Sequence, residues 1–267
     1  MNIKGSTILI TGAAGGIGGA LAKQLAARGA ELVLAARDLE SLHPLAAELM
    51  AMGNVPLLMP ADLSQSGVPA RLVRDSLDFV DRIDMLINCA GMQNFGFFAE
   101  ESEDQMATLL NVNIAAPMAL VGAVLPHMLK AGKGHIVNVG SIFGSIGFPC
   151  FTSYSASKFA LRGFSEALRR ELTGTGVQIT YVAPRFTKTP FNRGPVARMA
   201  KALKMNQDEP DSVAAEIVAA IERKDHSRYL GWPEKLFVRI NSLLPRLVDG
   251  PLMKQVDQMR PYATERN

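Results

Sequence analysis

Seven short runs of apolar and β-branched residues alternate in this chain with six longer segments of helical periodicity. Strands that read as continuous apolar runs, alternating with helices, are typical of a parallel sheet covered on both faces. Right-handed crossovers then build a doubly wound α/β sheet of about seven strands, which binds ligands at the carboxyl ends of its strands. The expected strands are Ser6–Thr11, Glu31–Ala35, Val55–Met59, Met85–Asn88, His135–Val139, Gln178–Val182 and Ser227–Leu230. The expected helices are Gly16–Arg28, Leu39–Met52, Val68–Val80, Ser102–Ala131, Thr152–Thr173 and Asp211–Arg223.

A glycine-rich segment follows the first expected strand and opens the first expected helix. Its sequence, Thr11-Gly-Ala-Ala-Gly-Gly-Ile-Gly18, places Gly12, Gly16 and Gly18 at this turn. Glycines let the backbone approach a pyrophosphate, and the helix N-terminus supplies N–H donors. The segment therefore predicts a dinucleotide site. A tight turn with close helix–strand packing is the alternative interpretation.

The end of the second expected strand bears on which dinucleotide binds. An NAD site usually has an acidic residue here, which binds the ribose 2′-hydroxyl. Ala36 offers no carboxylate, and the Arg37 guanidinium suits a 2′-phosphate. The sequence therefore favours NADP over NAD. In the alternative interpretation Arg37 is a solvated loop residue and Asp38 caps the next helix.

Tyr154 and Lys158 lie four residues apart and therefore share one face of an expected helix. A phenol normally has a pKa of about 10 and is a poor base at neutral pH. An ammonium ~4 Å from a developing phenolate is worth ~4 kcal/mol at an effective dielectric of ~20, or roughly three pKa units. This spacing predicts a Tyr154 pKa near neutrality, which suits a general acid or base.

These motifs occur in an order that resembles the short, single-domain branch of the short-chain dehydrogenase/reductase family, over roughly residues 5–231. The glycine segment matches its cofactor loop, and Ser141, thirteen residues before Tyr154, matches its Ser…Tyr-x3-Lys arrangement. The resemblance implies a Rossmann-like fold and a fourth catalytic residue, Asn113. The catalytic residues are thus expected to be Asn113, Ser141, Tyr154 and Lys158.

Further positions match the family's cofactor site. Asp62-Leu63 matches its adenine-contacting pair, and Asn88-Cys-Ala-Gly91 resembles the Asn-Asn-Ala-Gly motif that supports its central strand. Thr189 matches the threonine that contacts the nicotinamide carboxamide. The residues expected to bind the cofactor are Gly12, Gly16, Ile17, Gly18, Arg37, Asp62, Leu63, Asn88, Ala90, Tyr154, Lys158 and Thr189.

The resemblance also implies a mechanism. Tyr154 protonates a carbonyl oxygen as hydride arrives from the nicotinamide, and Ser141 hydrogen-bonds the same oxygen. Lys158 lowers the phenol pKa and binds the nicotinamide ribose, and Asn113 holds a water that relays the proton.

Three positions depart from the family pattern. Gly15 stands where many NADP-preferring relatives have a basic residue, and Cys89 replaces the second Asn of the central motif. Arg185 follows Pro184 where relatives usually have Gly. Its guanidinium is expected to shift the loop or to reach an anionic group.

The loops after the fourth, fifth and sixth expected strands are rich in phenylalanine, which indicates either an apolar substrate pocket or core packing beneath the loops. Of the twelve phenylalanines, eight lie there: Phe95, Phe97, Phe98, Phe143, Phe148, Phe151, Phe186 and Phe191. A pocket of this kind suits a fatty acyl, steroid-like or aromatic substrate.

Residues 185–207, the position of the family's substrate lid, contain six basic side chains and no acidic one. A helical stripe that begins at Val196 gives this segment an apolar side. A basic outer face would suit a carrier-linked substrate, although such a charge run is more often a solvated face. Residues 232–267 form a C-terminal amphipathic extension, which could cap the pocket, pack on a partner subunit or lie on a membrane surface. Packing against protein is preferred.

Composition excludes several other classes. The 267 residues are 48% hydrophobic and show no linker, so one domain is expected over 1–231 with the extension packed on it or on a partner. A net charge of +3 gives no indication of nucleic-acid binding, and two cysteines indicate a reducing compartment, so a cytoplasmic location is expected. No metal site and no transmembrane segment are expected. The long helices Ser102–Ala131 and Thr152–Thr173 predict a homodimer or homotetramer.

The sequence therefore predicts an NADP-dependent oxidoreductase that interconverts a carbonyl and an alcohol on an apolar substrate. Two other functions remain open. Nucleotide-sugar epimerases or dehydratases also use Tyr-x3-Lys, but they usually have a longer C-terminal domain. Cofactor-sensing proteins without turnover typically lose the Tyr or the Lys, and this chain keeps both.

Overall fold

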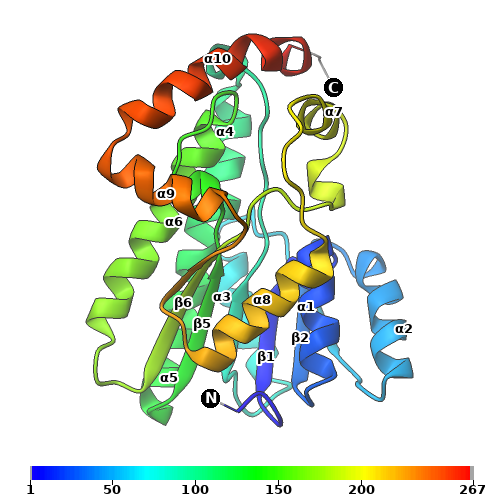
Figure 1. Ribbon diagram of the computed structural model, residues 1–267. Coiled ribbons are helices and arrows are strands. Elements are labelled where there is room, and N and C mark those ends of the chain that lie inside the picture. Colours follow the sequence, from blue (N-terminus) through cyan, green and yellow to red (C-terminus); the bar gives the residue numbers. More distant parts are fainter. Residues whose placement is uncertain (1, 265–267) are drawn as a thin grey trace.

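The computed structural model describes residues 2–264, which fold around one seven-stranded sheet (Figure 1). Adjacent strands are parallel throughout, in the order β3-β2-β1-β4-β5-β6-β7. The strands are β1 (Thr7–Thr11), β2 (Glu31–Ala36), β3 (Leu57–Pro60), β4 (Met85–Asn88), β5 (Gly134–Val139), β6 (Val177–Ala183) and β7 (Ser227–Tyr229). The predicted doubly wound parallel sheet is confirmed. Strand order reverses between β1 and β4, so a ligand crevice is expected at their carboxyl ends.

Helices cover both faces of the sheet because successive side chains of a strand point to opposite sides. In β1, Ile8 and Ile10 pack in the core shared with α1 and α8, whereas Leu9 packs in the core shared with α3, α5 and α6. The helices are α1 (Gly16–Ala26), α2 (His43–Ala51), α3 (Val68–Leu77), α4 (Glu103–Leu110), α5 (Ala116–Ala131), α6 (Thr152–Glu171), α7 (Pro195–Ala202), α8 (Pro210–Arg223), α9 (Glu234–Leu243) and α10 (Arg246–Ala263).

Several element bounds differ from the sequence prediction by a few residues, and two differences have a clear structural reason. Strand β3 begins at Leu57 rather than at Val55, because Val55 is 80% exposed and pairing with β2 starts at Leu57, opposite Val33. The expected single helix Ser102–Ala131 is interrupted, since a π-helical turn, Asn111–Ala115, joins α4 to α5. Such turns occur often at functional sites.

The helical stretch Glu103–Ala131 is long and apolar enough to span a membrane by length and composition alone. The expectation of no transmembrane segment stays a prediction, because a helix packed in the core of a folded domain passes the same test of length and composition. Polar residues interrupt the continuous apolar run without making the stretch polar on average. In this fold α5 packs against α3 and the sheet. Of the most apolar 18-residue segment within Glu103–Ala131, 39% is buried.

Residues 232–264, called the C-terminal arm here, contain α9 and α10. Figure 1 shows both helices beyond the upper ends of the strands, on the same side as α7. Met259 and Ala263 of α10 are buried in one cluster with Val196 and Met199 of α7. The arm therefore packs on the rest of the same chain, above the carboxyl ends of the strands.

Candidate active site

The glycine loop is shaped by contacts that leave no space for side chains. Gly12 has a φ of +67°, and a Cβ there would lie 2.7 Å from the Cα of Ala90. A Cβ on Gly16 would lie 2.5 Å from Cγ2 of Thr189, and one on Gly18 would overlap the carbonyl oxygen of Gly12. The N-terminus of α1 has no side-chain cap from the described residues, so its first N–H groups are available to a phosphate.

Arg37 and Asp62 lie at the part of the site where the adenosine end of a dinucleotide is expected. Arg37 is exposed at the end of β2, beside Ala36. Asp62 accepts hydrogen bonds from the backbone and hydroxyl of Ser64, which lower its pKa, and the charge of Arg37 lowers it further. Asp38 accepts from the backbone N–H of Ser41 in the following 3-10 helix, Glu40–Leu42, but the N-cap of that helix is Leu39. Leu63 is buried in the core cluster that contains Val33 and Met59.

The side chain of Asn88 is engaged within the sheet. It is 2% exposed and donates to Asn138 at 2.8 Å, and Asn138 donates to Ser165 at 2.8 Å. The Asn88 amide therefore ties β4 to β5 and α6 beneath the site, as the central-strand role implies. Cofactor binding by Asn88 stays a prediction, and it would have to involve the main chain, because the side chain is directed into the sheet. The backbone of Ala90, by contrast, lies directly against Gly12.

Tyr154 lies 7% exposed beneath the cavity and forms a hydrogen bond with the Ser141 side chain. Burial raises the Tyr154 pKa to about 12, and the Ser141 bond lowers it by less. The predicted pKa near neutrality is therefore wrong for this structure. Phe143, Phe151 and Phe191 surround the ring at centroid distances of 6.2 to 6.4 Å and remove water from the phenol.

Lys158 lies one turn further along α6 and is 5% exposed. Its Nζ is 5.7 Å from the Tyr154 ring centroid. It donates to the carbonyl oxygen of Val139 at 3.2 Å, and burial lowers its pKa to about 8. Cys89 also faces this region, and burial raises the pKa of its thiol to about 12.

Asn113 lies in the π-helical turn and is 1% exposed. Its Oδ1 accepts from the backbone N–H of Met92, and its Nδ2 donates to the Met92 carbonyl and the Ser157 hydroxyl. Both ends of the side chain are thus engaged with protein, which fixes the loop after β4 against α6.

A cavity of about 590 Å³ opens above these groups. It brings together eight predicted site residues: Gly12, Gly16, Ile17, Gly18, Ser141, Tyr154, Lys158 and Thr189. The other predicted residues, Asn113, Arg37, Asp62, Leu63, Asn88 and Ala90, lie outside its lining. One continuous space therefore joins the glycine loop to Tyr154.

Both interpretations of the phenylalanine-rich loops hold, for different residues. Phe143, Phe148, Phe186 and Phe191 line the cavity. Phe95 and Phe151 instead pack together at 4.9 Å, Phe97 lies under the Arg260 guanidinium, and Phe98 is 55% exposed. The outer wall of the cavity comes from the C-terminal arm, whose lining side chains sequence reasoning did not assign: Phe237, Ile240, Leu247, Val248, Pro251 and Leu252. The amphipathic character of residues 232–267 was the signal that this segment could cap the pocket.

The acidic residues that follow the lid segment (residues 185–207) change how its charges are interpreted. Arg185 binds Asp208 and Glu234, and Lys188 binds Glu209. The guanidinium of Arg185 therefore reaches anionic groups of the protein itself. Five of the six basic residues of the lid are exposed: Lys188, Arg193, Arg198, Lys201 and Lys204. Within residues 2–264 no cluster of His, Cys, Asp and Glu could hold a metal ion.

Comparison with known proteins places this geometry among oxidoreductases. Residues 6–199 match the sequence profile described as short chain dehydrogenase. The ketoacyl reductase HetN of Nostoc is 32% identical over 268 residues, covering 99% of this chain and 88% of that protein. Dehydrogenase/reductase SDR family member 7B of Bos taurus is 31% identical, covering 92% and 79%.

Solved structures show the same arrangement of elements. A short-chain dehydrogenase from Sphingobium yanoikuyae in complex with NADPH is 30% identical, with a TM-score of 0.79 and coverage of 94% of this chain and 96% of that one. A short-chain dehydrogenase/reductase from Burkholderia phymatum in complex with NAD is 25% identical, with a TM-score of 0.86 and coverage of 93% and 96%. Relatives of this chain thus bind either dinucleotide.

Proposed function

This chain belongs to the short-chain dehydrogenase/reductase family of oxidoreductases, and we propose that it reduces an apolar carbonyl compound to an alcohol with NADPH. One observation carries the proposal. The Ser141–Tyr154 pair and Lys158 lie at the floor of an apolar cavity that is continuous with a glycine loop suited to a dinucleotide phosphate. The loop fits such a group because its close backbone contacts exclude side chains from the cradle.

The residues divide the chemistry between them. A bound nicotinamide supplies the hydride. Tyr154, whose pKa is about 12, keeps its proton at neutral pH and donates it to the carbonyl oxygen, while Ser141 donates a hydrogen bond to the same oxygen. Lys158, still mostly protonated at neutral pH with a pKa of about 8, stabilises the phenolate that remains. The protonated phenol is the form that reduction requires, so it favours that direction.

Arg37 supports NADP as the cofactor. It is exposed at the end of β2, where an NAD site usually has an acidic residue, and its guanidinium can bind a 2′-phosphate in bidentate fashion. The NADPH complex of the Sphingobium relative agrees with this choice, whereas the Burkholderia complex with NAD makes it a point to be measured.

The cavity lining supports an apolar substrate. Phe143, Phe148 and Phe186 line one side, and Phe237 and Leu252 of the C-terminal arm line the other. Burial of alkyl or aromatic groups against such a surface stabilises binding by about 25 cal/mol per Å². A β-ketoacyl thioester combines a long alkyl chain with a reducible carbonyl, and the name of the Nostoc relative points to the same class.

The test is oxidation of NADPH by the purified chain with β-ketoacyl thioesters, aromatic ketones and steroid ketones. We expect Tyr154→Phe to lower kcat by about 10²–10⁴-fold, because it removes only the proton donor. The affinity for NADPH, measured by fluorescence titration, should stay within about twofold. Tyr229→Phe is the matched control, since this phenol lies on β7 outside the cavity lining. A Tyr154→Phe protein that turns over at the wild-type rate would overturn the assignment.

A further inference from the structure

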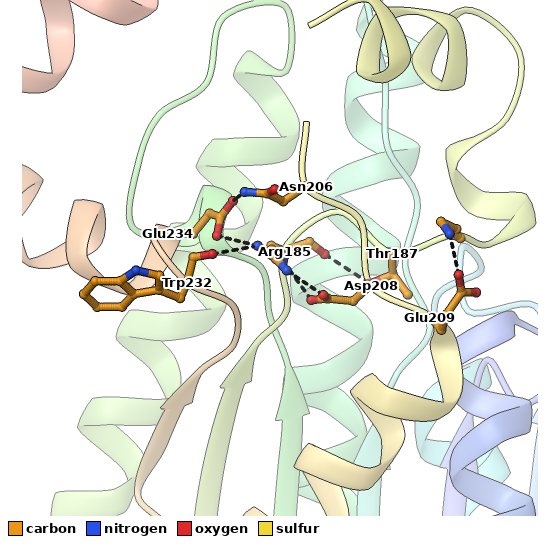
Figure 2. Close-up of polar contacts among 8 residues, drawn as sticks. Arg185, Thr187, Asn206, Asp208, Glu209, Trp232 and Glu234 are labelled. Atoms are coloured by element: carbon orange, nitrogen blue, oxygen red, sulfur yellow. Dashed lines mark hydrogen bonds and ion pairs between the residues drawn. The ribbon is translucent and has the colours of Figure 1, made fainter. Parts of the chain in front are cut away.

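Arg185 occupies the position after Pro184 at the exit of β6, where the family usually has glycine. Its side chain is only 16% exposed and forms four hydrogen bonds (Figure 2). Two join the guanidinium to Asp208 in a bidentate pair at 2.9 and 2.7 Å. A third reaches Glu234 at 2.8 Å, and a fourth reaches the carbonyl oxygen of Trp232 at 3.1 Å.

The partners of Arg185 come from two segments that are far apart in the sequence. Asp208 follows the lid segment and pairs through its backbone with Phe186 and Lys188 at 2.9 Å each. Trp232 and Glu234 open the C-terminal arm. Figure 2 shows the Arg185 side chain between these two segments. The lid also reaches the arm directly, since Asn206 donates to Glu234 at 3.0 Å.

The backbone at Gly231 packs closely against the Arg185 side chain, which is a second, independent observation. Its φ is +86°, and a Cβ at this position would lie 2.5 Å from Cδ and 2.7 Å from Nε of Arg185. The Arg185 stem therefore packs directly on the backbone where the chain turns from β7 into the arm. No other residue type fits here without moving the guanidinium.

We infer that Arg185 is a positioning residue that latches the lid to the C-terminal arm and thereby sets the shape of the outer part of the substrate cavity. Arg185 and Glu234 both line that cavity, and the arm beyond them supplies Phe237, Ile240 and Leu252 to its wall. Two carboxylates already occupy the guanidinium, so Arg185 is not the anchor for an anionic group of the substrate. Arg185 therefore affects substrates indirectly, by positioning the lid and the C-terminal arm that form the cavity wall.

The latch should affect the binding of long substrates more than that of short ones, an inference that rests on the proposed carbonyl reduction. A small carbonyl compound needs only the floor of the cavity at Ser141 and Tyr154. A long-chain substrate also needs the wall formed by the arm. Loss of the latch should therefore raise KM mainly for long-chain substrates, by about tenfold, since each charge-assisted hydrogen bond that orders the wall is worth about that much.

The main variant is Arg185→Gly, which restores the usual family residue, compared with Arg185→Lys. Lysine keeps the charge but cannot bind Asp208 in bidentate fashion and also reach Glu234, so we expect only partial rescue. Arg228→Gly is the matched control, because it removes an exposed ion pair with Glu216. Glu234→Gln is an isosteric second variant that releases only the arm, and it applies even if Arg185→Gly fails to fold.

Two readouts decide the matter. In Arg185→Gly, kcat/KM should fall at least about tenfold more for a long-chain β-ketoacyl thioester than for a short uncharged ketone. Hydrogen exchange of backbone amides over residues 231–248, measured without substrate, should become faster than in the Arg228→Gly control. Equal losses on both substrates, or unchanged exchange, would overturn the latch. Since exchange needs no turnover, failure of the proposed reaction leaves this second readout decisive.

Discussion

Replacement of Lys158 by methionine should make the protein more stable at neutral pH while it abolishes activity. Burial lowers the Lys158 pKa from 10.5 to about 8, so the folded chain gives up this proton more readily than the unfolded chain. At about 1.4 kcal/mol per pH unit, that difference amounts to about 3 kcal/mol against the folded state below the folded pKa. Methionine removes this cost of burying a charge. The lost hydrogen bond to the Val139 carbonyl offsets about 1 kcal/mol of the gain.

We therefore expect the free energy of unfolding of Lys158→Met to exceed that of the wild type by about 2 kcal/mol at neutral pH, which corresponds to a Tm about 4–8 °C higher. The sign of the pH dependence follows from linkage. Between the folded pKa of about 8 and the unfolded value of 10.5, the unfolded wild-type chain binds more protons, so wild-type stability rises with pH. The advantage of the variant should shrink across this window, and above it the lost bond to the Val139 carbonyl should leave the variant about 1 kcal/mol less stable than the wild type.

Urea unfolding of the two proteins at a series of pH values, without added dinucleotide, measures this difference. The matched control is Lys158→Arg, which keeps a buried charge and should show no gain at neutral pH. A Lys158→Met protein that is less stable than the wild type at neutral pH would refute the reasoning. A stability difference that stays constant across the window would do the same, because it would show that the ammonium is not the cause.

Three other expectations can be measured directly. Arg37→Asp should weaken NADPH binding by at least about tenfold relative to NADH in fluorescence titrations, because it replaces a phosphate partner with a like charge; an unchanged ratio would exclude Arg37 as a determinant. Neutralising Arg193 and Lys201 together should raise KM for carrier-linked substrates, and the defect should shrink with added salt; an equal, salt-insensitive loss on uncharged ketones would show that these charges do not meet the substrate. Sedimentation equilibrium should give a dimer or tetramer, because Met118 of α5 and Phe159 of α6 expose 45% and 42% of their surface. A fully active monomer would contradict the predicted interface.

The fold could be predicted from the sequence because its signals are local. Apolar runs of strand length, separated by helical patterns, require a parallel sheet covered on both faces, and the sheet follows that plan. Gly12, Gly16 and Gly18 were identifiable because a turn between strand and helix requires them at short range. Tyr154 and Lys158 were identifiable because spacing alone puts them on one helix face.

Electrostatics and long-range pairing depended on the tertiary structure. The Tyr154 pKa rises rather than falls because aromatic side chains from separate loops exclude water from the phenol. Asn88 could be matched to a motif, but only the sheet shows that its amide binds Asn138.

Arg185 is the plainest case of what the sequence left undecided. Its departure from the family glycine was visible along the chain, but its carboxylate partners lie 23 and 49 residues away. Ion pairing and desolvation depend on distances in space, which a linear pattern does not contain. The sequence by itself thus determined the sheet, the glycine loop and the helix face that Tyr154 and Lys158 share. The tertiary structure decided which charges are paired, which are buried, and which segments close the cavity.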